Sequence, residues 1–508
     1  MNTPSDHTKR RFRITGAKIA PLGASNDVLD GMDFWIADGR IAAIGAAGLA
    51  PPFESGSYET LEFSNALVLP GLINSHSHST SALQRGKNAG APLDLFVMEA
   101  MARRSPQTMD HVRAGVLLHA IEMLKHGVTG VVDHFRHGAV PSVEAVLTVF
   151  QAYDDIGMRA AVAPMFEDKK YIDSLPIDPE SLPEDVQDRW RHMKPPSAHD
   201  YFAMMEEIGD EVRDQGRVKL MLGVDGPQRC TTQLLEMAGD FAARHQVGLH
   251  THLLEAKTQA LMAPPEFEGS FVAYLNHFGL IGPRSSLAHF VWGTDRDIEL
   301  AAETRVNVVN NPVSNLLLGS GLQPTARMLE AGVSVGLGSD GCSGNGMNMF
   351  EHARFSMLLS RISQPDCDRW MTAPQALRLA TTGGAAVMGE PGTLGVIEVG
   401  AHADLAILDL DSPTYKPMGD IWNHLVMFET GDSVDTVFVG GEICLQGGRC
   451  TKIDEDAVYA QVSELAERSE LDSAQNFSVT RRERPAFQPL IVEALQRDIK
   501  INRFARLA

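Results

Sequence analysis

Apolar and polar positions alternate differently along successive parts of this 508-residue chain. In the first part, short apolar runs are separated by Asp-Gly and Gly turns, and Asp38-Gly39 divides two such runs. An Asp-Gly pair between apolar runs favours a β-hairpin. Runs of the same kind return near the other end of the chain, at 403–408, 434–441 and 442–445. We therefore predict one small flanking β-sandwich domain built from both chain ends, residues 1–65 and 390–453.

From about residue 66 onward, strand-like apolar runs alternate with helical ones, such as 111–126 and 234–245. The strand candidates lie at 66–74, 128–134, 159–164, 218–224, 247–252, 286–290, 306–310 and 333–338. Eight alternations of strand and helix predict an α/β fold, a closed (β/α)8 or TIM barrel over residues 66–389. The catalytic groups of such a barrel lie at the C-terminal ends of its strands. The tail, 454–508, is mixed and charged, and we predict that it is a helical extension.

Composition narrows the possible partners. The net charge is −21, and a surface this acidic repels phosphate backbones, which excludes nucleic acid. No apolar run approaches the roughly 20 residues that a membrane helix needs, and the polar stretch 1–13 has no apolar signal core. The cysteines are scattered, which argues against a disulfide framework or a cysteine zinc site; they are Cys230, Cys342, Cys367, Cys444 and Cys450. We expect a cytoplasmic protein that binds a small molecule, stays off membranes and forms a homodimer or homotetramer.

Histidines mark the ends of the first and fifth predicted strands. His76 and His78 are two residues apart, so their side chains point to the same face and can hold one metal ion. His252 ends the fifth strand and offers a third ligand, with Glu255 just beyond it as an acid/base group. His250 shares the strand face of His252, so the spacing alone does not choose between them. We interpret His250 as a structural histidine of the barrel.

The sixth and eighth predicted strands end in His289 and Asp340. A histidine within so apolar a strand is costly unless it has a hydrogen-bond partner. Asp340 is well placed to bind a metal ion and to take a proton from metal-bound water. Each signal is modest by itself. Together, such groups at the ends of strands one, five, six and eight of one barrel predict a metal-dependent hydrolase.

Longer motifs extend this pattern over most of the chain. They are PGLINSHSH at 70–78, GVTGVVD at 127–133, HLLE at 252–255, AH at 288–289, NPVSNL at 311–316, LGSDG at 337–341 and GVIEVGAHADL at 395–405. With these motifs the chain resembles the amidohydrolase superfamily. Within it, the chain is similar to the cytosine deaminase-like and chlorohydrolase-like group, which includes S-adenosylhomocysteine deaminases.

The resemblance implies a ligand set for one divalent ion, made of His76, His78, His252 and Asp340. It also implies that Glu255 shuttles protons and that His289 contacts the attacking water or the substrate. Binuclear relatives bridge two ions with a modified lysine at the end of the fourth strand. Here that end reads GVD at 223–225, and Lys219 lies too early in the strand. A single-metal site is therefore favoured.

A ligand set of nitrogen and oxygen with an open position suits Zn²⁺, with Fe²⁺ as the alternative. Such an ion lowers the pKa of bound water towards about 7, which makes hydroxide available. We expect Asp340 to accept the proton of the water, Glu255 to deliver a proton to the departing nitrogen, and His289 to stabilise charge on the tetrahedral intermediate.

The predicted protein is a hydrolase acting on carbon–nitrogen bonds other than peptide bonds. Its predicted reaction is the hydrolytic deamination of an amino-substituted nitrogen heterocycle by metal-activated hydroxide. The same groups could instead cleave an amide, a urea or an aryl chloride. A non-catalytic scaffold is disfavoured, because such proteins generally lose metal ligands and this chain retains the whole set.

The residues predicted to bind the substrate are Asp225, Arg229, Gln84 and Trp292. Many purine-type deaminases of the group have histidine where Asp225 stands and a small hydroxyl residue in place of Arg229. Either these two residues pair with each other, or Asp225 receives an amino group and Arg229 binds a carboxylate or carbonyl. Gln84 lies in a match to the group, and Trp292 stands where nucleoside deaminases often have histidine. The departure at Asp225 argues against an assignment to adenosine-type nucleosides.

Two further features are left open by the sequence. His134 and His137 follow the second strand and could line a pocket, although a surface or structural role is favoured. The insertion 169–200 is rich in Pro, Asp and Glu, and it is expected to form a lid, an oligomer contact or a solvated loop.

Overall fold

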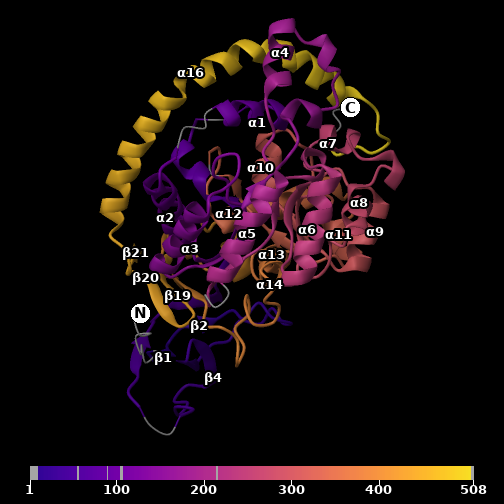
Figure 1. Cartoon of the computed structure of the whole chain (residues 1–508). Coiled ribbons are helices and arrows are strands. Elements are labelled where there is room, and N and C mark those ends of the chain that lie inside the picture. The colour runs from indigo at the N-terminus through magenta and orange to yellow at the C-terminus, as the bar shows by residue number, and fades with distance from the viewer. Residues whose placement is uncertain are drawn as a thin grey trace.

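The computed structural model describes residues 10–53, 56–87, 90–102, 107–212, 216–341 and 343–504. Cys342 and the extreme ends of the two predicted terminal segments lie outside these residues. Figure 1 shows a body of strands surrounded by helices, a smaller group of strands at one end, and a long C-terminal helix that curves along the body.

Strands and helices alternate through the middle of the chain, as the hydrophobic pattern predicts. The strands are β1 (Phe12–Thr15), β2 (Lys18–Ile19), β3 (Met32–Ala37), β4 (Arg40–Ala46), β5 (Glu59–Glu62), β6 (Ala66–Pro70), β7 (Leu72–His78), β8 (Val128–Asp133), β9 (Arg159–Val162), β10 (Met165–Phe166), β11 (Val218–Leu220), β12 (Gly223–Val224), β13 (His250–Leu253), β14 (Ser286–His289), β15 (Asn307–Asn310), β16 (Val335–Leu337), β17 (Asp340–Gly341), β18 (Leu405–Asp409), β19 (Val434–Val439), β20 (Glu442–Gln446) and β21 (Arg449–Cys450). The α-helices are α1 (Leu93–Ala102), α2 (Met109–Lys125), α3 (Val143–Ile156), α4 (Glu184–His192), α5 (Ala198–Val212), α6 (Thr232–His245), α7 (Lys257–Leu261), α8 (Phe271–His277), α9 (Asp295–Thr304), α10 (Pro312–Leu317), α11 (Thr325–Glu330), α12 (Met349–Ser363), α13 (Ala373–Leu379), α14 (Thr382–Val387), α15 (Ile421–Met427) and α16 (Glu455–Gln496).

Backbone hydrogen bonds link the strands of the middle part in the order of the sequence. β7, β8, β9 and β11 are parallel neighbours, and β13, β14, β15 and β16 form a second parallel set. Leu222 joins the two sets, because its N–H donates to Gly248 and its carbonyl accepts from His250. β17 follows β16 and pairs with β7. The C-terminal ends of these strands therefore share one edge, as the site prediction requires.

The predicted strand 66–74 is in fact two strands that lie in different sheets. β6 pairs antiparallel with β18, whereas β7 joins β8 in the parallel set. Gly71 stands between them, and a Cβ at this position would lie 2.2 Å from Thr129 Oγ1. The chain passes so close to β8 that only glycine fits. A continuous apolar run does not reveal this change of sheet.

Apart from the short parallel pair β10-β12, the remaining strands form two sheets that share a core. One sheet has the order β4-β3-β1-β5, and the other has the order β2-β6-β18-β19-β20-β21. Phe12 of the first sheet packs edge-on against Phe438 of the second, with ring centroids 5.5 Å apart. The hairpin predicted at Asp38-Gly39 connects β3 and β4. Side chains from both ends of the chain are thus buried together.

The insertion 169–200 packs against α1 and α16, so its interpretation as a solvated loop is wrong. It contains two 3-10 turns and α4, and its apolar residues join a buried cluster with both helices. Trp190 packs edge-on against Phe487 of α16, with ring centroids 5.9 Å apart. Figure 1 shows α4 and the end of α16 side by side above the body. The aromatic side chains of the insertion, which its Pro, Asp and Glu content obscures, explain the difference.

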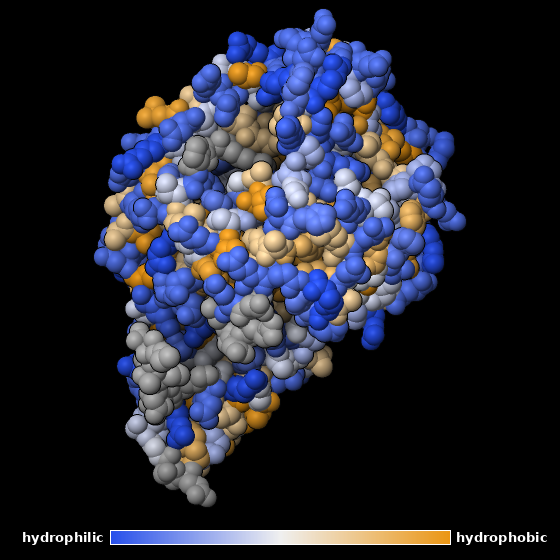
Figure 2. Space-filling model, viewed as in Figure 1, coloured by the Kyte–Doolittle hydropathy of each residue, from blue (hydrophilic) through white to orange (hydrophobic). Residues whose placement is uncertain are grey.

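Hydrophilic residues cover most of the face shown in Figure 2, with apolar residues scattered between them. Within the described parts of the chain, every helix is too short or too polar to cross a lipid bilayer.

Candidate functional site

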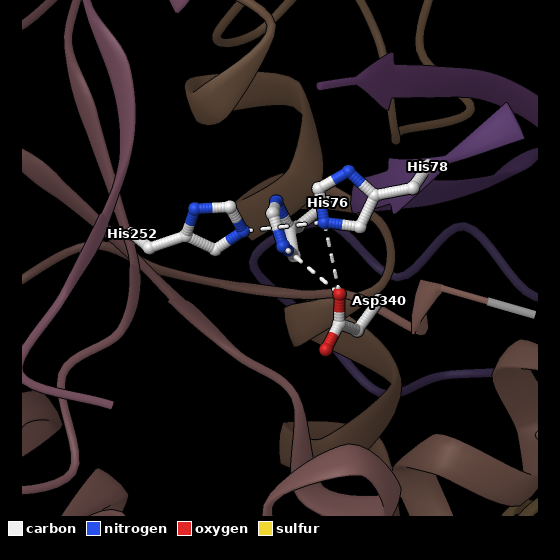
Figure 3. Close-up of side chains that lie close together, drawn as sticks. All are labelled: His76, His78, His252 and Asp340. Carbon is white, nitrogen blue, oxygen red and sulfur yellow. Dashed lines mark hydrogen bonds and ion pairs between the residues drawn. The ribbon is translucent and has the colours of Figure 1, made fainter. Parts of the chain in front are cut away.

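Four side chains converge at the shared C-terminal edge of the parallel strands (Figure 3). His76 and His78 come from β7, His252 from β13 and Asp340 from β17. The Oδ1 atom of Asp340 lies 3.1 Å from His78 Nε2 and 3.4 Å from His76 Nε2. His78 Nε2 is 3.2 Å from His252 Nε2. All four ligand atoms lie within 4.8 Å of one another, so one small cation can contact the whole set.

Hydrogen bonds aim the Nε2 atoms of this group at its centre. His78 Nδ1 donates to the carbonyl of His134 at 2.7 Å, and His252 Nδ1 donates to the carbonyl of Asp225 at 2.8 Å. Each ring therefore keeps the lone pair of its Nε2. His76 Nε2 is buried and has no hydrogen-bond partner within the described residues. The group thus offers three imidazole nitrogens and one carboxylate oxygen, and one of the nitrogens, His76 Nε2, is buried without a hydrogen-bond partner among the residues that the structure describes. This combination fits a divalent ion such as Zn²⁺.

Backbone strain accompanies the site. Leu254, His289, Phe290 and Asp340 all have positive φ values, of 50°, 73°, 47° and 66°. Residues other than glycine rarely adopt this region, and such strain gathers at functional sites. Here it turns the chain sharply where the strands end, and it holds His289 and Asp340 at the same edge.

Glu255 faces the ligand group from just beyond β13. It is 4% exposed, and its Oε2 lies 3.7 Å from His289 Nε2. Its Oε1 has no hydrogen-bond partner among the described residues. Burial and the negative charge of Asp340 raise the pKa of Glu255 well above its ordinary value. The raised pKa favours the protonated form of Glu255, as a proton donor requires.

His289 is held as a neutral ring. Burial lowers its pKa to about 4, and its Nδ1 lies 2.9 Å from Asn315 Oδ1. Because an amide oxygen only accepts, Nδ1 carries the hydrogen and Nε2 presents a lone pair towards Asp340 Oδ2, 3.9 Å away. In this form the ring can accept a hydrogen bond at Nε2. Its expected role in stabilising charge on the intermediate stays a prediction.

Ser314 and Asn315 contact Asp340 and His289, and neither residue was predicted to be part of the site. Ser314 Oγ donates to Asp340 Oδ2 at 2.5 Å, and Asn315 orients His289. Both stand at the start of α10, within the NPVSNL motif. The motif itself was the available signal, but nothing in its sequence says which side chains it contacts.

The loop after the fourth predicted strand is built around a buried charge network. Asp225 is 2% exposed, and its carboxylate accepts from Arg136 at 2.7 Å and from Arg229 at 3.2 Å. Arg136 also forms an ion pair with Glu167. Burial opposes the ionisation of Asp225, but the charge of Arg229 and a hydrogen bond from His252 hold its pKa well below the ordinary value. Of the two interpretations open from the sequence, the geometry matches the ion pair, with Arg136 as an unforeseen third member.

A cavity of about 230 Å³ opens onto these groups. Its polar lining includes His78, His252, Glu255, Asp340, Asp225, Arg136, Arg229 and Gln84, and its apolar lining includes Leu93, Phe96, Val97, Leu317 and Leu318. The lining thus combines charged groups with apolar side chains. A flat ring with polar edges matches this combination.

Three predicted residues lie elsewhere. Trp292 is 1% exposed, and its Nε1 donates to the carbonyl of Ser320 at 2.7 Å, so its indole points away from the cavity. His134 is fully buried beside His252, with ring centroids 4.8 Å apart, so it is not a surface residue. His137 contacts the carbonyl of Gln107 at 3.2 Å. None of these side chains is part of the cavity lining.

The sequence matches the model of the amidohydrolase family over residues 67–444. It is 32% identical over 467 residues to a 5-methylthioadenosine/S-adenosylhomocysteine deaminase of Desulforudis audaxviator, covering 90% of this chain and 99% of the relative. It is 31% identical over 441 residues to a 5'-deoxyadenosine deaminase of Methanosarcina mazei, covering 85% of this chain and 92% of the relative.

Two solved structures have a similar fold. One is an adenosine deaminase from Xanthomonas campestris with bound zinc, with a TM-score of 0.78 and 24% identity. The match covers 91% of this chain and 98% of that structure. An atrazine chlorohydrolase from Arthrobacter aurescens in complex with zinc covers 90% of this chain with 100% of its own, at a TM-score of 0.80 and 24% identity. At this level of identity the likeness establishes the fold alone.

Proposed function

The chain belongs to the amidohydrolase family, and we propose that it removes an amino group hydrolytically from a nitrogen heterocycle. The observation that carries this proposal is the meeting of two kinds of group in one cavity. A set of four metal-ligand atoms lies beside Glu255, whose pKa is raised, and His289, whose pKa is lowered. Hydrolytic deamination needs an activated water, an acceptor for its proton and a proton donor for the nitrogen.

His76, His78, His252 and Asp340 would hold one divalent ion, with Zn²⁺ favoured over Fe²⁺. When bound, such an ion polarises a water molecule and lowers its pKa towards about 7. Within the described part of the parallel set, Lys219 forms an ion pair with Glu390 away from this edge. This arrangement supports a site for a single ion.

Each reacting group then has a task. Asp340 accepts one proton from the attacking water, and Ser314 keeps its carboxylate oriented during this transfer. His289 Nε2 accepts a hydrogen bond from the same water and aligns it. Glu255 protonates a ring nitrogen, and the proton held by Asp340 passes to the amino group, which departs as ammonia. The second proton of the water returns to Glu255 as the ring carbon keeps the oxygen as a carbonyl. The carbon–nitrogen bond is replaced by a carbon–oxygen bond with no change of oxidation state.

The curated relatives support deamination over the alternative bonds, because the two described above are named as deaminases of adenosine-type compounds. Their named substrates carry a nucleoside sugar. This chain places the Asp225, Arg136 and Arg229 network at the cavity wall. We infer that the heterocycle itself, bound among this network and the apolar side chains of the cavity, is the recognised part of the substrate.

We also infer that the circuit of parallel strands is a closed (β/α)8 barrel and that the two terminal sheets form a separate sandwich. The order of pairing from β7 to β17, and the separate core around Phe12 and Phe438, support both inferences. In this view the barrel places the site, and the sandwich covers its opposite end.

Ammonia release tests the proposal. The zinc-loaded protein is offered aminopurines, 5-methylthioadenosine, S-adenosylhomocysteine, aminopyrimidines, aminopterins and aminotriazines, with an anilide, a urea and a chlorotriazine beside them. We expect ammonia from at least one amino-heterocycle, and release from the same compound that is about 10²- to 10⁴-fold slower with Glu255→Gln. Turnover of the anilide, urea or chlorotriazine without ammonia from any amino-heterocycle would overturn deamination.

A further inference from the structure

His76 differs from the other two ligand histidines in what holds its ring. The rings of His78 and His252 are held by backbone carbonyls. The Nδ1 of His76 instead lies 2.7 Å from Nε2 of His250, and the Nδ1 of His250 lies 2.6 Å from Ser286 Oγ. His76, His250 and Ser286 are all 0% exposed, so this chain of contacts is closed to solvent.

Metal binding at His76 would fix the position of each shared hydrogen along the contacts from His76 to His250 and Ser286. If His76 Nε2 gives its lone pair to an ion, Nδ1 must carry the hydrogen and donate to His250 Nε2. His250 then carries its own hydrogen on Nδ1 and donates it to Ser286 Oγ. With the opposite arrangement, His250 Nε2–H would face His76 Nδ1, and His76 would hold its hydrogen on Nε2. That form of His76 cannot bind a metal.

We infer that His250 and Ser286 are positioning residues that lock His76 in its metal-binding form. Groups that orient ligand histidines generally change metal affinity by about 10- to 100-fold when they are replaced. The role requires an acceptor at the place of His250 Nε2 and a hydroxyl at Ser286. It rests on the proposed metal-dependent function, but it concerns the affinity of the site and not the substrate.

His134 also lies next to His76, but within the described part of the chain it forms no hydrogen bond with that ring, whereas His250 lies at hydrogen-bond distance from His76 Nδ1. The His134 ring centroid lies 5.2 Å from that of His250 and 6.1 Å from that of His76. Both of its ring nitrogens lack a hydrogen-bond partner in the described part of the chain. His134 therefore packs beside the contacts that join His76, His250 and Ser286, which we call the relay, without taking part in their hydrogen bonds.

Zinc affinity, measured by competition with a chromophoric chelator, tests the relay. Ser286→Ala should weaken zinc binding by about 10- to 100-fold. His250→Leu should weaken it at least as much, whereas His250→Gln should restore most of the affinity, because its side-chain oxygen reaches the place of Nε2 and accepts from His76. Rescue by glutamine separates an acceptor role from simple filling of space.

Ser285→Ala is the matched control. Ser285 is buried next to Ser286, but its hydroxyl donates to Leu280 and accepts from Leu249, away from the ligands. Thermal unfolding of the zinc-free variants should show a similar loss of stability for Ser285→Ala and Ser286→Ala, with zinc affinity lowered only in the second. If His250→Leu fails to fold, this pair still decides the question.

Wild-type zinc affinity in Ser286→Ala would overturn the relay and leave the proposed function intact. A second bound ion that is lost in His250→Gln would also overturn it, because His250 would then be a ligand. Failure of the wild-type protein to bind zinc, iron or any other divalent ion tightly would refute the proposed metal-dependent function itself.

Discussion

Replacing Glu255 with glutamine exposes the cost of burying its carboxyl group. Burial and the charge of Asp340 raise the pKa of Glu255, so the folded apoprotein keeps a proton that the unfolded chain releases. The folded state then binds more protons than the unfolded state. Its free energy of unfolding falls as pH rises from the unfolded pKa, near 4.5, to the raised folded pKa. The slope is about 1.4 kcal/mol per pH unit for one proton, and it vanishes above the folded pKa.

Glu255→Gln keeps the size of the side chain and removes this titration. Urea unfolding of chelator-treated wild type and variant, at intervals from about pH 5 to about pH 8, measures the difference in unfolding free energy. We expect the difference to change in favour of the variant as pH rises, by up to about 1.4 kcal/mol per pH unit. The zinc-loaded variant should lose about 10²- to 10⁴-fold in kcat. A stability difference that does not change with pH would show that Glu255 is already ionised in the folded protein and would refute its role as the acid.

Three further changes address the surroundings of the site. Ser314→Ala removes a hydrogen bond to a charged acceptor, which is worth about 1.5–3 kcal/mol. In steady-state kinetics it should lower kcat/KM about tenfold or more, mainly through kcat. Ser314→Thr, which keeps the hydroxyl, is the control. Asp225→Asn leaves Arg136 and Arg229 with one carboxylate fewer and should cost about 3–5 kcal/mol in urea unfolding, and an unchanged midpoint would contradict a buried network. Phe487→Ala removes the ring against Trp190 and should cost about 3–5 kcal/mol locally. Its effect should be faster proteolysis within the insertion 169–200, and equal cleavage rates in wild type and variant would contradict the packing of α16.

Periodicity predicted the parallel strands well because their side chains are buried on both faces. β14 and β15 are buried along their whole length, and such strands read as continuous apolar runs. The same rule failed at 66–74, where the apolar run of β6 continues into Leu72 and Ile73 of β7 although the two strands belong to different sheets. Gly71 separates them, and the need for glycine arises from the approach of Thr129, a contact far away in the sequence.

The meeting of His76, His78 and Asp340 could be predicted, because strand alternation assigns residues to faces and parallel strands bring their C-terminal ends to one edge. The choice of His252 as the fourth member came from the family resemblance. Alternation does not say how close to the C-terminal edge of the strands a side chain lies, which we call its depth. His250 and His252 share a face, but His252 reaches the ligand group at the edge while His250 contacts His76. Depth depends on how neighbouring strands are staggered, and no short sequence pattern encodes that stagger.

The misplacement of Trp292 has a related cause. The sequence places it three residues after His289, close enough along the chain to share the cavity. However, His289 and Phe290 both have positive φ values, so the chain turns sharply at the end of β14. The turn holds the imidazole of His289 at the site and sends the indole of Trp292 towards Ser320. The two positions are therefore linked: the same turn that brings His289 to the ligand group keeps Trp292 out of the cavity lining, which leaves Asp225, Arg136 and Arg229 among its charged residues.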